Sequence, residues 1–129
     1  MIIIKCETGD DLAIDADTLS GAKLSGLNLH RALLEGQILR GADLSGTDLR
    51  SAWLKGTVFD VANMTRVRMP ACNAAGASFV RAILVEAFMR SAGFELANFA
   101  GADLRGANVG RARFHGAIFL GRRRSSSLP

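Results

Sequence analysis

Residues 42–46 read Ala-Asp-Leu-Ser-Gly, and this five-residue unit recurs along most of the chain. Counting in steps of five from Leu19 to Phe119 gives 21 central positions, of which 20 carry a large apolar residue and only Ala74 a small one. Alanine fills 14 of the 21 positions two residues before the centre, and glycine fills 11 of the positions two residues after it. A fixed short period of this kind is typical of a repeat architecture, so the repeat decides the fold.

A spacing of five fits neither of the regular backbone elements. On an α-helix, which turns by about 100° per residue, five steps rotate the side chain by about 140°, and the apolar residues would spread around the helix. On a straight strand, side chains alternate every two residues, so successive central residues would point to opposite faces. A chain that turns a corner once per five residues keeps every central residue inside. Alanine two positions earlier then fits beside it, and glycine near the corner permits unusual φ and ψ angles.

The large side chains show a second period of 20 residues, which is four five-residue units. The phenylalanines 59, 79, 99 and 119 recur at this interval. A coil with four sides would place these rings above one another at the spacing of adjacent strands, about 4.8 Å. We therefore predict a four-sided coil of about five turns. One column of its core would contain Leu19, Leu39, Phe59, Phe79, Phe99 and Phe119.

Three of the units resemble the A(D/N)LXX signature of pentapeptide-repeat proteins: Ala-Asp-Leu-Ser-Gly at 42–46, Ala-Asn-Phe-Ala-Gly at 97–101 and Ala-Asp-Leu-Arg-Gly at 102–106. The resemblance covers residues 17–121 in an unbroken frame. It implies an all-β fold, the right-handed quadrilateral β-helix of that family. The handedness and the types of turn come from this resemblance and not from the period.

The two ends of the chain depart from the repeat. Residues 1–16 begin with three isoleucines at 2–4 and continue with polar residues, which predicts a strand and turn that cover the first coil. Residues 122–129 begin with three arginines followed by three serines, and we expect a disordered basic tail there. The sequence shows no C-terminal cap, so Phe114 and Phe119 in the last coil are expected to be partly exposed.

Composition limits the classes of protein to consider. The chain has 129 residues and a net charge of +4, although residues 1–16 carry one base and four acids. Cys6 and Cys72 form no disulfide framework and stand in no metal-ligand spacing. No apolar run resembles a signal peptide or approaches the roughly 20 residues of a membrane span. We expect one cytoplasmic domain without a cofactor and without membrane binding.

One predicted side of the coil carries an arginine in every turn. It is centred on residues 29, 49, 69, 89 and 109, with His30 beside the first of them. These arginines would bind phosphates or an acidic protein. Alternatively, they form a solubilising row whose charges pair with Asp48 or stay hydrated. The candidate basic stripe consists of Arg31, Arg50, Arg68, Arg90 and Arg111.

A second side, centred on the phenylalanine column, places apolar residues outward. They would form a contact surface, for instance with a second copy of the chain. Alternatively, they reflect the preference of exposed sheets for branched residues. Trp53 and Leu33 on the neighbouring side would extend the patch. The candidate apolar side consists of Ile38, Val58, Val61, Val80, Ile118 and Leu120.

The sequence contains no arrangement that indicates catalysis. His30 and His115 fall on different sides, and neither has a carboxylate and a nucleophile placed to form a triad. Cys72 takes an alanine position and should be a small buried thiol. No phosphate-binding glycine loop leads from a strand into a helix. We therefore expect a protein that is not an enzyme.

The function that fits best is binding or scaffolding, in which a flat side of the coil is presented to a protein partner. Three alternatives stay open. Some relatives mimic duplex DNA and engage DNA gyrase, which confers fluoroquinolone tolerance, but mimicry needs an acidic surface and residues 17–121 carry 12 bases against 8 acids. The basic stripe and the arginines at 122–124 would bind nucleic acid weakly, because no aromatic residues stand beside them. The chain would also form a homodimer through its apolar side or its C-terminal end.

Overall fold

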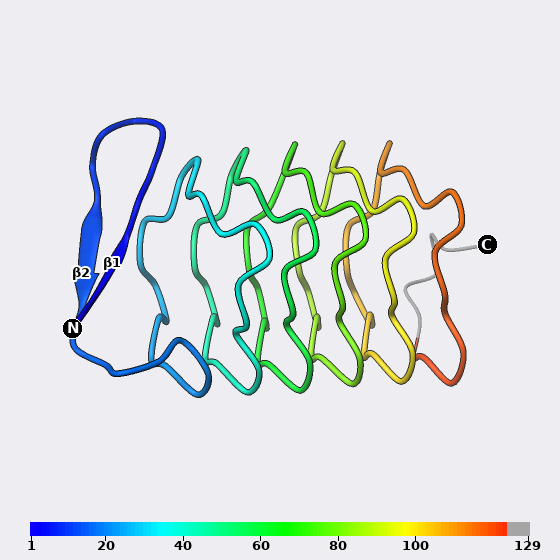
Figure 1. Ribbon diagram of the computed structural model, residues 1–129. Coiled ribbons are helices and arrows are strands. Elements are labelled where there is room, and N and C mark those ends of the chain that lie inside the picture. The colour runs from blue at the N-terminus through cyan, green and yellow to red at the C-terminus, as the bar shows by residue number, and fades with distance from the viewer. Residues whose placement is uncertain (124–129) are drawn as a thin grey trace.

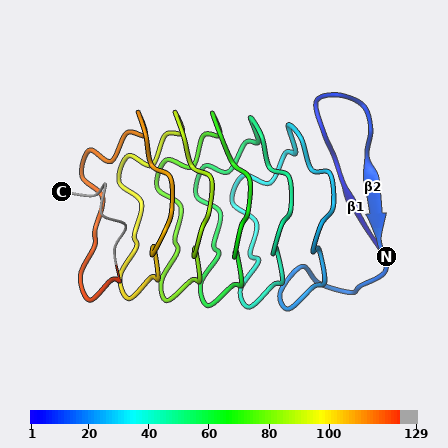
Figure 2. The same ribbon diagram turned by 180° about the vertical axis from the view of Figure 1, so that it is seen from behind.

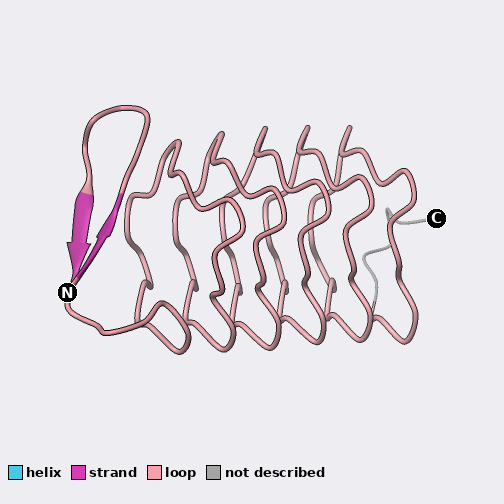
Figure 3. Cartoon of the chain, in the orientation of Figure 1, coloured by secondary structure: helices cyan, strands magenta, loops and turns pink. Residues whose placement is uncertain are grey.

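The computed structural model describes residues 1–123 and begins with a β-hairpin. Strand β1 (Ile2–Ile4) pairs antiparallel with strand β2 (Leu12–Ile14), with Ile2 opposite Ile14 and Ile4 opposite Leu12. Ile4 and Ile14 are buried and Ile3 is exposed, because successive residues of a strand point to opposite faces. Figure 3 shows that these are the only named strands within residues 1–123.

The segment after β1 joins the hairpin to the first coil. Cys6 forms an antiparallel bridge with Ala32, and the carbonyl of Lys5 accepts a hydrogen bond from the Leu33 amide at 2.8 Å. The amide of Glu7 donates to the carbonyl of Arg31 at 3.1 Å. Residues 5–7 therefore satisfy backbone groups at the N-terminal edge of the coil, which is how a cap protects the end of a repeat array.

The rest of the described chain winds into a stack of four-sided coils (Figures 1 and 2). Residues 20 apart lie side by side in parallel bridges, and one column runs through Lys23, Asp43, Asn63, Ile83, Asp103 and Arg123. From Asp43 onward, each bridged residue donates its amide to the coil below, on its N-terminal side, as Asp43 does to the Ala22 carbonyl at 2.9 Å. The next residue donates to the coil above, as Leu44 does to the Asn63 carbonyl at 2.7 Å. The period of 20 and the quadrilateral β-helix are thus confirmed.

The corners explain both the glycine pattern and its exceptions. At most corners the carbonyl of the central residue accepts a hydrogen bond from the amide three residues later, as in Leu39 and Ala42 at 3.1 Å. The third residue of each turn has a positive φ, which a type II turn requires and which glycine adopts without steric cost. Ten non-glycine residues hold the same position with φ from 51° to 62°, among them the β-branched Val61 at 51°.

The core consists of the central residues and the small residues beside them. Rings from successive coils stack: the centroids of Phe59 and Phe79 lie 5.1 Å apart, those of Phe79 and Phe99 4.8 Å, and those of Phe99 and Phe119 5.1 Å. Phe94 meets the Phe79 and Phe99 rings edge to face. Both arrangements are favoured for aromatic pairs. The structure therefore places the predicted phenylalanine column in the core.

Two threonines replace alanine in the core without leaving a polar group unsatisfied. Thr47 and Thr57 are fully buried. The Thr47 hydroxyl donates to the Leu24 carbonyl at 2.7 Å, and the Thr57 hydroxyl donates to the Leu34 carbonyl at 2.8 Å. Each threonine therefore adds a bond to the coil below, which removes the desolvation penalty of a buried hydroxyl.

The last described coil is less buried than those before it. Phe114 and Phe119 are only partly buried, as the sequence predicted, and Arg122 lies over the Phe119 ring at 5.3 Å from its centroid. Arg123 still bridges to Asp103, so the coil continues two residues beyond the boundary at 121. The remainder of the predicted tail, residues 124–129 with Arg124, lies outside the described residues.

Candidate functional site

One side of the coil, which we call the Arg side, comprises residues 28–31, 48–51, 68–71, 88–91 and 108–111. The five arginines of the candidate stripe lie on it in three different registers. Arg68 is bridged in the middle of the side, whereas the other four occupy turn positions at its corner. The stripe is therefore not a straight row: four of its arginines follow one corner of the coil, and Arg68 lies apart from them. Its turn residues are Arg31, Arg50, Arg90 and Arg111.

The Arg side accounts for the whole net charge of the chain. It carries five of the 16 basic residues and one of the 12 acidic residues, which leaves 11 of each elsewhere. Asp48 is that acid, and it pairs with Arg50 through a contact of 2.9 Å. Within residues 1–123, the other four arginines of the side form no ion pair. They are exposed and available to an anionic partner.

The neighbours of Asp48 fix its charge state. Burial alone would raise the pKa of this carboxyl, but hydrogen bonds from Arg50 and the charges of Arg50 and Arg68 hold it below its ordinary value. Gly110 makes room for another arginine of the side, since a Cβ there would lie 2.7 Å from Nη1 of Arg90. The guanidinium of Arg90 therefore lies against the surface of the next coil.

One aromatic residue, Phe88, stands among these arginines. Phe88 points outward, is half-buried, and is bridged to Arg68 on one side and Asn108 on the other. The expectation that no aromatic residue stands beside the basic ones was therefore wrong. The position of Phe88, directly before the central Met89, would have placed it on this outer side.

The Phe side, centred on the phenylalanine column, is not continuously apolar. Its bridged column reads Ile38, Val58, Ser78, Asn98 and Ile118. The Ser78 hydroxyl and the Val80 amide both donate to Oδ1 of Asp60. This polar link divides the candidate apolar side, because Ile38, Val58 and Val61 lie before it and Ile118 and Leu120 after it.

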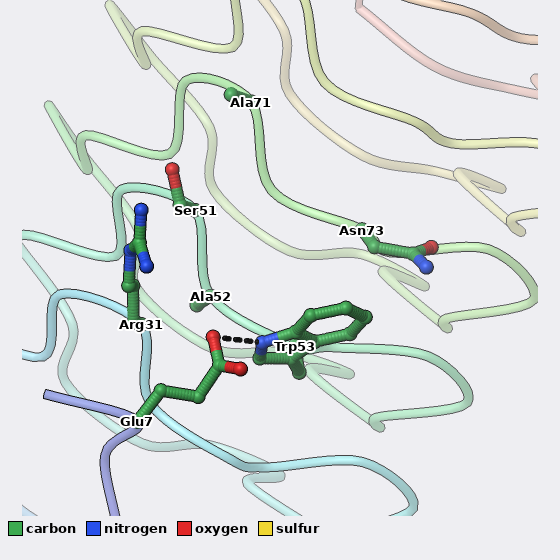
Figure 4. A pocket seen from close by; sticks show the side chains of 7 residues that line it. All are labelled: Glu7, Arg31, Ser51, Ala52, Trp53, Ala71 and Asn73. Carbon is green, nitrogen blue, oxygen red and sulfur yellow. Dashed lines mark hydrogen bonds between the residues drawn. The ribbon is translucent and has the colours of Figure 1, made fainter.

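A recess opens beside the Arg side, where it meets the Trp side, which is centred on residues 34, 54, 74, 94 and 114. Its volume is about 320 Å³, and Figure 4 shows the residues that line it. Nε1 of Trp53 donates to Oε1 of Glu7 at 2.6 Å, which joins the N-terminal cap to the second coil. The sequence gives no sign of this contact, because it joins residues 46 apart. The lining residues are Glu7, Arg31, Ser51, Ala52, Trp53, Ala71 and Asn73.

Cys6, Asp10 and His30 line one small recess, but within residues 1–123 no hydrogen bond joins their side chains. Burial raises the pKa of Cys72 to about 12, so this thiol is protonated at neutral pH. His30 belongs to the Arg side and His115 to the Trp side. Among residues 1–123, no three His, Cys, Asp or Glu side chains are grouped to hold a metal ion. The same residues include no helix of the length and apolarity that a membrane crossing requires.

The chain was compared with protein families and known proteins. A family model described as pentapeptide repeats matches residues 18–56, 42–78 and 94–121. Among solved structures, HetL from the cyanobacterium Nostoc sp. strain PCC 7120, a pentapeptide repeat protein involved in heterocyst differentiation regulation, has a TM-score of 0.51 and 26% identity. The match covers 81% of this chain and 56% of HetL, so the chain spans about half of that relative's length.

Two further structures share the architecture at lower similarity. Rfr23 from the cyanobacterium Cyanothece 51142 has a TM-score of 0.45 and 20% identity, over 92% of this chain and 76% of its own. Full-length QnrB1, a plasmid-mediated fluoroquinolone resistance protein, has a TM-score of 0.38 and 18% identity, over 78% of this chain and 68% of its own. No curated protein matches the chain.

Proposed function

Because the chain belongs to the pentapeptide-repeat family, with its right-handed quadrilateral β-helix, we propose that it is a non-catalytic protein that binds a protein partner through the Arg side. The observation that carries this proposal is that the net charge of +4 resides entirely on that side, where four arginines form no ion pair within residues 1–123. Such a side is complementary to an acidic protein surface.

The backbone of the coil makes this surface rigid. Each side is bonded to the coils above and below it, so outward side chains stand at fixed intervals of about 4.8 Å along the stack. Arginine presents its donors in a planar fork that matches a carboxylate in two-point contacts. Because the backbone is already ordered, only the side chains lose conformational freedom when a partner binds.

The similarity to HetL, with a TM-score of 0.51, supports a binding role. HetL is involved in the regulation of heterocyst differentiation, and a regulatory role of that kind fits a protein that acts by contacting other proteins. A DNA-mimicking role toward gyrase has no comparable support, because mimicry of DNA needs an acidic surface and the Arg side is basic.

The proposal is tested by charge reversal on one side at a time. The variant combines Arg68→Glu, Arg90→Glu and Arg111→Glu, and the matched control combines Arg40→Glu, Lys55→Glu and Arg81→Glu, which change the net charge equally on other parts of the surface. Proteins captured from the native cell extract are identified by mass spectrometry. We expect a partner that the parent and the control retain and the Arg-side variant loses. Equal capture by both variants would refute the Arg side as the binding surface.

A further inference from the structure

We propose that the recess at Trp53 is the anchoring site for the protein partner, and that it takes an aromatic side chain flanked by a carboxylate from a short acidic segment. This inference rests on the proposed function, because it adds a specific contact to the basic surface. Figure 4 shows Arg31 and Ser51 on one side of the recess, the indole of Trp53 on the other, and Ala52 between them.

The polar groups of the recess favour an anionic and hydrogen-bond-accepting occupant. Arg31 is exposed and forms no ion pair within residues 1–123, although Glu7 lines the same recess. The Asn73 side chain accepts a hydrogen bond from the Ala75 amide through Oδ1 at 3.2 Å, which leaves its NH2 group to donate. The Arg31 guanidinium is suited to hold a carboxylate, and the Asn73 amide, which Figure 4 places on the far side of Trp53 from Arg31, is suited to donate to a second acceptor of the occupant.

The apolar part of the recess favours a ring. The bond from Trp53 to Glu7 holds the indole in place, so its face is presented without loss of freedom on binding. Ala52 and Ala71 line the recess with small side chains. A volume of about 320 Å³ lies at the lower end of the range for ligand pockets, about 300–1,000 Å³, which suits one side chain. Tryptophan and arginine are also the residues most enriched where binding energy concentrates in interfaces.

The surroundings favour a peptide over a nucleic-acid strand. Glu7 contributes a negative charge inside the recess, and residues 1–17, which form the cap and lead into the first coil, carry five acids against one base. A strand with a phosphate on every unit would meet this repulsion next to the recess. A peptide can instead place its carboxylate at Arg31 and uncharged groups toward the cap.

The test uses a displayed library of random heptapeptides, panned against the full chain and against the variant Arg31→Ala. Arg81→Ala is the matched control, because Arg81 is an exposed arginine at the same turn position, with a φ of 55° against 59° for Arg31, but lies on the Phe side. Enriched peptides are then synthesised without tryptophan and titrated while the emission of Trp53 is followed. Trp53 is the single tryptophan of the chain, so its emission reports occupancy of the recess.

We expect peptides that combine an aromatic residue with neighbouring acids, a change in Trp53 emission on binding, and binding about tenfold weaker in Arg31→Ala but unchanged in Arg81→Ala. Three results would show that the recess at Trp53 is not the anchoring site. They are the absence of enriched peptides, peptides that bind Arg31→Ala as well as the parent, and tighter binding of a single-stranded oligonucleotide than of any peptide.

The outcomes also separate this inference from the proposed function. If partner capture depends on Arg68, Arg90 and Arg111 but survives Arg31→Ala and Trp53→Ala, the basic surface stands and the anchor is refuted. If peptides bind the recess and capture survives the reversal of Arg68, Arg90 and Arg111, the anchor stands and the Arg side as a whole does not.

Discussion

The two ends of the coil use similar core residues but bury them differently. At the N-terminal end the hairpin of β1 and β2 covers the first coil, and Ile4, Leu19 and Leu24 are 2%, 7% and 0% exposed. At the other end the larger Phe114 and Phe119 remain partly exposed. A side chain in a stacked coil is thus buried by the coils on both sides of it. Its size alone therefore does not determine how much it contributes to stability.

The largest effect is expected in the middle of the stack, where a ring has a neighbour above and below. Phe79 is fully buried between Phe59 and Phe99. Phe79→Ala should lower the free energy of unfolding by about 3–5 kcal/mol, because it removes apolar contacts and leaves a cavity that a rigid coil cannot close. Urea unfolding followed by circular dichroism measures this loss, and a loss below 1 kcal/mol would show that the coils do not support one another.

Truncating a core side chain should cost more free energy of unfolding at the N-terminal end than at the C-terminal end, although the C-terminal side chain is the larger one. Ile4→Ala should cost about 2–4 kcal/mol, because Ile4 is buried between the cap and the coil. Phe119→Ala should cost only about 1 kcal/mol, since its ring already meets solvent. The same unfolding experiment compares the two variants. A greater loss for Phe119→Ala would contradict the account of the two ends.

The effect of a corner substitution on the free energy of unfolding should not depend on how far that corner lies from either end of the coil. Val61 has a φ of 51°, in a region that is unfavourable for a branched residue by about 1–2 kcal/mol. Val61→Gly should therefore raise the free energy of unfolding by about 0.5–1 kcal/mol, even after the entropy cost of glycine. Gly41→Val, at the corner one coil below, is the reverse control and should destabilise the protein. A destabilised Val61→Gly would show that Val61 contributes packing that outweighs the strain.

The smallest effect concerns the charge of Asp48. Its folded-state pKa lies below the ordinary value of 3.8, so its contribution to stability is complete above that value and is lost as the pH falls through the folded pKa. Asp48→Asn should cost less than about 1 kcal/mol at pH 7 and nothing at the acid end, because the group is partly solvated. Unfolding measured from pH 7 down to pH 2 tests this, and a cost that grows as the pH falls would contradict it.

The repeat made most of the fold predictable, and the limits of prediction have physical causes. The period of five assigns every residue between 17 and 121 to the core, a corner or an outer position, so even the different registers of Arg31 and Arg68 follow from counting. The direction of Phe88 follows from the same count. The contact between Glu7 and Trp53 does not, since residues 1–16 have no repeat to place them against the coil. The strained φ of Val61 becomes visible only when the corner is known to require a positive value.

Photo-crosslinking from individual sides of the coil shows directly whether a protein contacts the Arg side in the cell. A photoreactive amino acid replaces Arg90 on the Arg side and, as the control, Arg40 at a corner of the Phe side, and both variants are irradiated in the native cells. We predict a discrete protein adduct from position 90 and none from position 40. A protein adduct from position 40 alone, or a nucleic-acid adduct from position 90, would contradict the proposal that the Arg side binds a protein.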